Sequence, residues 1–185
     1  MLDMIYNGIM NGKNICLKNL DLKYCQQYYV DWLNDTSINS YIEPRLYKQT
    51  IESVTQYVKE LHESSDGYIF GMFCEDKHIG NIQLSAIHPI YKCGKIGYVI
   101  GEKEYWGRGI ATEAIGLVKD FAFKTLNLHR LEALVFEEHI ASQKALMKNG
   151  FVKEANFRKK VCMIPGGKWS DYYVYGVLNE DYKAQ

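Results

Sequence analysis

Two glycines flank an arginine in the segment YWGRGIATEA, residues 105–114, immediately before a stretch with helical periodicity. The first backbone N–H groups of a helix have no hydrogen-bond partner within the helix, and they attract anions. Gly107 and Gly109 can adopt positive φ and have no Cβ atom, so a phosphate can approach their backbone closely, and Arg108 adds positive charge beside them. The spacing therefore predicts a loop that binds a pyrophosphate group.

Three other structures could use such glycines. A simple reversal of the chain needs nothing more than the pair. A P-loop requires G-x-x-x-x-G-K-[ST], but Gly167 and Lys168 are followed by Trp169, and Cys162 stands where the first glycine belongs, so that motif is excluded. A dinucleotide fold requires G-x-G-x-x-G directly after a strand. Thr112 occupies the third glycine position here, which leaves a nucleotide-dependent oxidoreductase as a minor alternative.

The loop resembles the coenzyme A signature of the GNAT superfamily of N-acetyltransferases, Gln/Arg-x-x-Gly-x-Gly/Ala, which falls on residues 106–111. Trp106 departs from the usual first position. This form of the motif is similar to that of the branch containing the ribosomal-protein N-acetyltransferases. The resemblance implies that coenzyme A is bound by the loop residues Trp106, Gly107, Arg108, Gly109, Ile110, Ala111 and Thr112.

Two further segments carry the same resemblance. Residues 139–151, HIASQKALMKNGF, match the family pattern Asn-x-x-Ser-x-x-x-x-x-Lys-x-Gly-Phe at Ser142 and at the closing Lys, Gly and Phe. His139 stands where Asn is usual, and the resemblance places both His139 and Ser142 against the cofactor. Residues 167–178, GKWSDYYVYGVL, are similar to the last strand of this branch. The three segments together extend the resemblance over nearly the whole chain.

The resemblance implies acetyl-coenzyme A as co-substrate, held along a split between strands near 96–100 and 131–136, with the amine entering from the other side. The backbone N–H of Ile100 would face the thioester oxygen, and such a donor contributes about 2.7–4 kcal/mol to catalysis. Leu146 replaces the tyrosine that many relatives use to protonate the departing sulfur. Ser142 is the substitute acid that this branch suggests, although a serine on a helix also commonly hydrogen-bonds its own backbone.

The amine must lose a proton before it attacks, because an alkyl ammonium has a pKa of about 10. Some relatives place a glutamate at the position of Leu134, so that base is absent. Glu137 and Glu138 at the end of the same strand are candidate catalytic residues. Glu43 and His139 are further candidates for the base.

The acceptor pocket is predicted from polar and aromatic residues near the expected split. Glu43, Arg45 and Tyr98 are candidate substrate-binding residues, and Arg45 could recognise an acidic group. Seven tyrosines lie in segments that could border the pocket: Tyr28, Tyr29, Tyr41, Tyr47, Tyr98, Tyr172 and Tyr173. Core packing is the usual role of such side chains.

These features predict an acetyl-coenzyme A-dependent N-acetyltransferase that acts by direct attack in a ternary complex. The resemblance favours a protein N-terminus as acceptor, as in ribosomal-protein acetylation. A small-molecule amine, such as an amino sugar, a polyamine or an antibiotic, stays open as an alternative. So does a catalytically inactive acyl-coenzyme A-binding regulatory domain, because the usual residues are missing at positions 134 and 146.

Hydrophobic periodicity predicts the elements that position these residues. The expected order is strand 13–20, helices 21–35 and 51–64, three strands between 68 and 101, helix 111–126, strand 130–137, helix 141–150, and strands 157–164 and 171–178. The central strand–helix–strand unit implies one parallel pair in an otherwise antiparallel sheet. The fold class is therefore α/β, a mixed, mostly antiparallel sheet flanked by helices, and the resemblance makes it a GNAT-like acyl-coenzyme A N-acyltransferase fold over a single domain, 1–185.

Composition limits the other possibilities. The 185 residues carry a formal net charge of zero, which disfavours nucleic acid as a partner. No signal sequence or apolar stretch of membrane length is present, so we expect a cytoplasmic protein with no membrane partner. Five cysteines without a C-x-x-C pair predict reduced, mostly buried thiols, and the histidines predict no metal site. Homodimers are common among proteins of the family that the sequence resembles.

Overall fold

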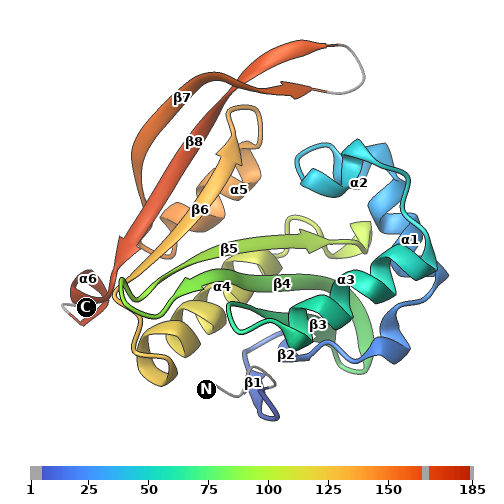
Figure 1. Cartoon of the computed structure of the whole chain (residues 1–185), viewed down its shortest axis with the longest axis horizontal. Helices are drawn as coiled ribbons and strands as arrows, with labels where there is room; N and C mark the ends of the chain where they lie inside the picture. The colour runs from blue at the N-terminus through green and yellow to red at the C-terminus, as the bar shows by residue number, and fades with distance from the viewer. Residues whose placement is uncertain (1–5, 164–166, 184–185) are drawn as a thin grey trace.

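The computed structural model describes residues 6–163 and 167–183. Their strands form one eight-stranded sheet in the order β1-β2-β3-β4-β5-β6-β8-β7. Figure 1 shows that β7 and β8 form a long hairpin at one edge of this sheet. The strands are β1 (Ile9–Asn11), β2 (Cys16–Asn19), β3 (Tyr68–Cys74), β4 (Lys77–His88), β5 (Cys93–Ile100), β6 (Arg130–Phe136), β7 (Val152–Met163) and β8 (Lys168–Leu178).

Helices connect the strands and cover both faces of the sheet. The α-helices are α1 (Gln27–Asn34), α2 (Thr36–Asn39), α3 (Ile51–Glu63), α4 (Ile110–Asp120), α5 (Ile140–Met147) and α6 (Asn179–Lys183). Thr50 caps α3 as the sequence predicts, and its hydroxyl accepts a hydrogen bond from the backbone N–H of Ser53. A π-helical turn, Phe121–Thr125, extends α4.

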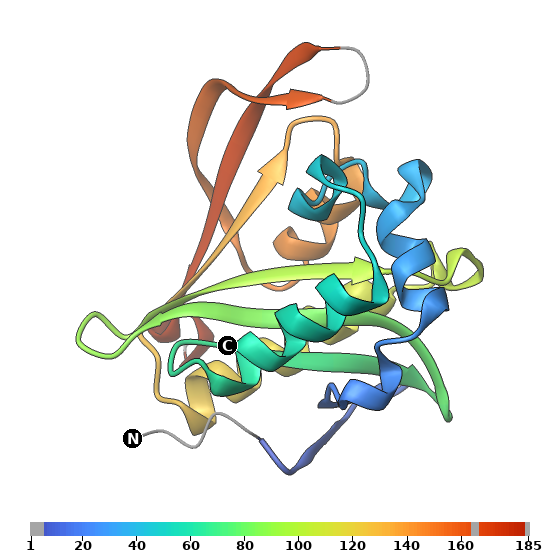
Figure 2. The same cartoon turned by 45° about the vertical axis from the view of Figure 1, so that its right-hand side comes forward.

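Two apolar clusters hold the helices against the sheet. The larger cluster joins α4, through Ala114, Ile115 and Val118, to sheet residues including Phe70 and Ile82. The smaller cluster packs α1 and α3 against the other face; its members include Tyr29, Trp32, Val54, Val58 and Ile69. Figure 2 shows α3 in front of the strands with α4 behind them. One face of the sheet therefore carries α4 and α5, and the other carries α1 and α3.

The sheet opens between β5 and β6. These strands are parallel, and only the pairs from Cys93 with Arg130 to Lys95 with Glu132 are in register. Beyond Lys95 the two strands diverge, as Figure 1 shows. The divergence leaves the second half of β5 without a neighbour on that side, which is the split that the sequence resemblance implied.

Most predicted elements are confirmed, including the parallel pair and the mixed, mostly antiparallel sheet. The sequence prediction missed β1, α6 and the short helical segments α2 and Glu43–Leu46, which lie between the predicted helices 21–35 and 51–64. Segments of three to five residues contain too few apolar positions to show periodicity. The predicted turn at Pro165 and Gly166 lies outside the described residues.

The prediction of mostly buried cysteines is wrong. All five are free thiols, but Cys25 alone is buried, and the other four are partly exposed. Cys16, Cys74 and Cys93 are each the first or last residue of a strand, and Cys162 is near the end of the edge strand β7, positions at which the sheet covers the side chain less completely. Across the described residues no helix is long and apolar enough to cross a bilayer.

Candidate active site

The glycine loop leads directly into α4. Gly107 has φ of 73° and Gly109 has φ of 82°, both in the left-handed region that favours glycine. A Cβ atom built on either residue would meet no other atom within 4 Å. Gly109 is the N-cap of α4 and provides no side-chain cap. The first amides of α4 therefore face open space, as an anion-binding helix start requires.

Contacts from three parts of the chain fix this loop. Lys77 bridges Glu102 at 2.6 Å and Glu104 at 2.7 Å. The Trp106 indole N–H donates to the carbonyl oxygen of Ile100 at 2.9 Å. Glu113, in the first turn of α4, accepts a hydrogen bond from the backbone N–H of Asn14 at 2.8 Å. The loop conformation is thus set before any ligand binds.

The end of β5 directs backbone groups into the split. Gly101 donates its N–H to the carbonyl oxygen of Ile79 at 2.9 Å, and the next pair along the ladder is Ile100 with Gly80. In an antiparallel ladder, alternate residues turn their N–H groups toward opposite neighbours. The N–H of Ile100 therefore points away from β4, toward the side from which β6 has diverged.

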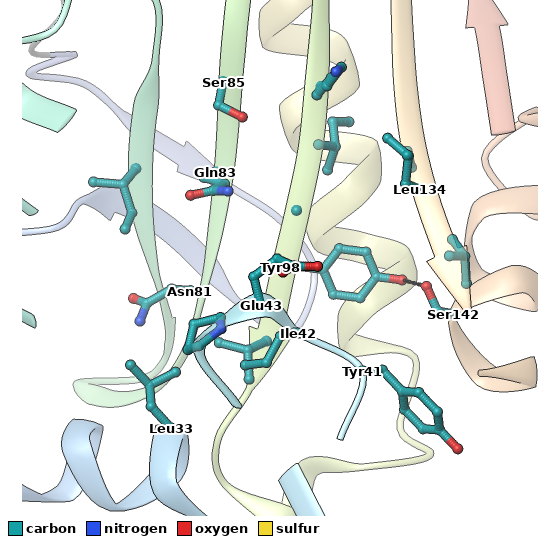
Figure 3. Close-up of a pocket in the computed structure, with 18 of the residues that line it drawn as sticks. Leu33, Tyr41, Ile42, Glu43, Asn81, Gln83, Ser85, Tyr98, Leu134 and Ser142 are labelled. Carbon is teal, nitrogen blue, oxygen red and sulfur yellow. Dashed lines mark hydrogen bonds between the residues drawn. The ribbon is translucent and has the colours of Figure 1, made fainter. Parts of the chain in front are cut away.

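Ser142 lies at the bottom of this split. Its side chain is on α5 and is 6% exposed, and its hydroxyl is 2.7 Å from the phenol oxygen of Tyr98 on β5. Figure 3 shows the Tyr98 ring reaching from β5 across to Ser142. Burial raises the pKa of Tyr98 to about 12, and the hydrogen bond with Ser142 opposes that rise. The phenol is therefore protonated at neutral pH and can act as a donor.

A cavity of about 640 Å³ extends from Ser142 and Tyr98 onto the sheet face covered by α1 and α3. Figure 3 shows its polar residues along β4 and, beside them, the segment of Tyr41, Ile42 and Glu43. The lining residues Glu43, Leu46 and Tyr47 are exposed, so this segment forms the mouth of the cavity. Its walls come from α1, α3, β4, β5, β6 and the 41–49 segment. The cavity thus joins the split to the surface.

Several predicted residues line this cavity. Glu43, Tyr98, His139 and Ser142 are among its lining residues. Of the seven predicted tyrosines, five line it: Tyr29, Tyr41, Tyr47, Tyr98 and Tyr172. Tyr28 instead hydrogen-bonds the ring of His78 at 2.9 Å, and the Tyr173 hydroxyl donates to Glu137 at 3.1 Å.

The candidate bases differ in their surroundings. Glu137 and Glu138 are absent from the lining of the described cavity. Glu138 accepts hydrogen bonds from Ser170 and, at 3.3 Å, from Lys168, and the hydrogen bond from Ser170 is the main cause that lowers its pKa. Glu43 lines the cavity, its side chain is 68% exposed, and its Oε1 atom lies 4.0 Å from Nη1 of Arg45. Of the three candidate carboxylates, Glu43 is therefore the one that borders the described cavity.

His139 is a half-buried imidazole at the start of α5. Its ring stacks on Tyr41 with a centroid distance of 4.5 Å and an interplanar angle of 15°. Burial lowers the pKa of His139 to about 4, so the ring is neutral at pH 7.

Arg45 lies outside the lining of the described cavity. Its guanidinium donates to the carbonyl oxygens of Ile42 at 2.9 Å and Cys162 at 3.3 Å, and it lies 4.7 Å from the centre of the Phe136 ring. Its side chain is 5% exposed. Arg45 thus connects the cavity mouth to β7. The role predicted for Arg45, recognition of an acidic group on the acceptor, does not require this contact.

The sequence reading missed three polar residues of the cavity, Asn81, Gln83 and Ser85, which follow one another at two-residue spacing on β4. The alternation NIQLS contained the signal, because polar residues on one side of a buried strand must meet a cavity or a partner.

Within the described residues, no group of three His, Cys, Asp or Glu side chains could hold a metal ion.

The Acetyltransferase (GNAT) domain model matches residues 14–152 of the chain. The probable N-acetyltransferase YjcK of Bacillus subtilis (strain 168) is 40% identical over 131 residues, which cover 69% of this chain and 70% of that protein. Spermidine N(1)-acetyltransferase of Escherichia coli (strain K12) is 30% identical over 138 residues, or 75% of this chain and 71% of that one.

A solved structure shows the same fold. RimL, a ribosomal L7/L12 alpha-N-protein acetyltransferase in complex with coenzyme A, superposes with a TM-score of 0.81 at 18% identity, covering 92% of this chain and 98% of that chain. At this identity the likeness bears on the fold alone.

Proposed function

Because the chain belongs to the GNAT acetyltransferase family and is an acyltransferase, we propose that it transfers the acetyl group of acetyl-coenzyme A to a primary amine by direct attack in a ternary complex. The observation that carries the proposal is one continuous arrangement. A cavity reaches from Tyr98 and Ser142, beside the split between β5 and β6, to the surface, and the open start of α4 follows β5 along the chain. We place this reaction in the cytoplasm, as expected from the sequence.

The loop residues fit the role of binding coenzyme A. The backbone at Gly107 and Gly109 is unobstructed, and the exposed Arg108 lies within 5.6 Å of the Tyr105 ring centre, where it adds charge at the helix start. Residues 106–112 would hold the diphosphate through backbone N–H groups. His139 and Ser142 border the inner end of the split. When bound, acetyl-coenzyme A supplies an acetyl group activated as a thioester.

Two groups of the chain would assist the transfer directly, and a third would act through one of them. The Ile100 N–H, directed into the split, can stabilise negative charge on an acyl oxygen placed beside it. The Ser142 hydroxyl can give a proton to a departing sulfur, and the Tyr98 phenol 2.7 Å away can donate to Ser142 in turn. Both groups are in place before substrate binds.

We assign removal of the proton from the amine to a carboxylate at the cavity mouth. We propose that Glu43 attracts the incoming ammonium and accepts its proton directly or through water, because this carboxylate lines the cavity. The catalytic role predicted for Glu137 and Glu138 stays a prediction. A direct role for either one requires its carboxylate to leave the hydroxyl partners that hold it.

The acceptor is a protein N-terminus or a small amine in this proposal. One relative is named for spermidine, which supports a small amine, and the sequence resemblance to the branch of the ribosomal-protein N-acetyltransferases supports a protein N-terminus. The proposal is tested by incubating the protein with acetyl-coenzyme A and three amines: a free peptide, spermidine and glucosamine. Release of free thiol that depends on the amine, with acetylated product found by mass spectrometry, is the expected result. A protein that binds coenzyme A but acetylates none of the three would contradict the proposal.

A further inference from the structure

Asn81 presents a buried hydrogen-bond donor without an acceptor. The side chain is 4% exposed, and its oxygen accepts from the Nε2 atom of His78 at 2.8 Å. Its amide nitrogen makes no hydrogen bond within the described residues. The Asn81 side chain opposes the rise in the Tyr29 pKa that burial causes, so the two groups are close, but the Asn81 nitrogen forms no hydrogen bond with the Tyr29 hydroxyl. A buried amide left in this state is costly unless a ligand completes it.

Asn81 belongs to a chain of hydrogen bonds behind the cavity. Its oxygen lies 2.8 Å from Nε2 of His78, and burial lowers the pKa of His78, so the ring is neutral and carries its proton on Nε2. Nδ1 then accepts a hydrogen bond from the Tyr28 hydroxyl, 2.9 Å away. The chain Tyr28–His78–Asn81 therefore leaves the NH₂ group of Asn81 for an occupant of the cavity that it lines.

The side-chain oxygen of Gln83, like that of Asn81, is occupied by a donor from the protein. It accepts a hydrogen bond from the Tyr57 hydroxyl. Both residues line the cavity on β4, two positions apart, and Figure 3 shows them one above the other along that strand. Residues at this spacing are about 6.8 Å apart along a strand. An extended peptide repeats its same-side carbonyl oxygens at the same interval.

The charges in the cavity disfavour a polycation. Among the residues lining the described cavity, Glu43 is the single carboxylate and Lys95 the single ammonium group. A polyamine would bring several ammonium groups and find one acidic partner. Its amines have a pKa of about 10.4, whereas a peptide α-amino group has a pKa of about 7.7–8.0 and is roughly a tenth deprotonated at pH 7. A site with one exposed carboxylate as its base suits the peptide better.

On the basis of the proposed function, we infer that Asn81 and Gln83 are specificity residues that bind carbonyl oxygens of the acceptor, and that the acceptor is the free N-terminus of an extended peptide. The Asn81 and Gln83 amides donate to the peptide backbone, and Glu43 meets the incoming ammonium group before the amine reaches the split beside Ile100.

Calorimetric titration of the protein in saturating coenzyme A tests this inference without turnover. The probes are the tetrapeptide tetra-alanine amide, spermidine and glucosamine. The peptide should bind most tightly. Gln83→Leu removes one neutral donor and should weaken peptide binding about three- to tenfold, while leaving the affinities for coenzyme A and spermidine unchanged. Asn81→Leu should act in the same direction if it folds. Gln56→Leu, on α3 and outside the cavity lining, is the matched control and should change nothing.

Three outcomes would overturn the inference: tighter binding of spermidine or glucosamine than of the peptide, unchanged peptide binding by Gln83→Leu, or equal losses for all three probes. Acetylation assays separate this result from the proposed function. Efficient acetylation of spermidine with poor peptide binding would refute the peptide inference and leave the acetyltransferase standing. Peptide binding that depends on Gln83, without acetyl transfer to any amine, would support the binding site and contradict the transferase.

Discussion

Gly109→Ala separates the role of the glycine loop in binding from its role in folding. Gly109 has φ of 82°, and an added Cβ atom would meet nothing within 4 Å. The substitution therefore creates no collision in the free protein. Its cost there is the left-handed backbone, roughly 1–2 kcal/mol for a residue with a Cβ atom. For a chain of this size, the melting temperature should fall by about 2–8 °C.

The same methyl group should impair ligand binding much more. It stands at the N-cap of α4, beside the amides that would receive the diphosphate of coenzyme A. Loss of one hydrogen bond to a charged group costs about 1.5–3 kcal/mol, which corresponds to a roughly 10- to 150-fold weaker affinity. Isothermal titration with coenzyme A measures this directly. In thermal melts, the wild-type protein should gain about 2.7 kcal/mol at a ligand concentration 100 times its dissociation constant.

Gly167→Ala is the matched control. Gly167 also has positive φ, 63°, and an added Cβ would likewise meet nothing within 4 Å, but it precedes β8, far from the loop along the chain. Both variants should lose similar stability, and Gly109→Ala alone should lose affinity for coenzyme A. Equal affinities in the two variants would refute the assignment of the loop as the diphosphate site.

Three further predictions concern the split and its surroundings. Ser142→Ala should lower kcat about 10²–10⁴-fold with little change in coenzyme A affinity, measured by thiol release and titration; a change in affinity alone would make Ser142 a binding residue. Glu138→Gln should keep near wild-type kcat/KM, because Glu138 is held by Ser170 outside the cavity lining, and a loss above tenfold would restore it as the base. Because burial lowers the pKa of His139 from 6.5 to about 4, the neutral ring contributes stability above pH 6.5 that is lost as the pH falls toward 4. Denaturant unfolding should therefore show His139→Asn losing about 3 kcal/mol less than the wild type across that range, and parallel losses would exclude this residue as the cause.

The sequence alone determined the local features of this protein. The glycine loop, its helix and the strands on either side follow from neighbouring residues, because backbone freedom at Gly109, a free helix start and apolar periodicity act over a few positions. The family match and the parallel pair between β5 and β6 were predicted from the same local patterns.

The tertiary structure decided which side chains meet. Tyr98 reaches Ser142, 44 positions away, because β5 and β6 diverge at Lys95 and leave room for the ring between them. The same register turns Asn81 and Gln83 into the cavity, whereas Glu137 and Glu138 pair with residues of β8. These contacts depend on strand pairing and on packing between distant segments. The spacing of residues along one element predicts neither of them.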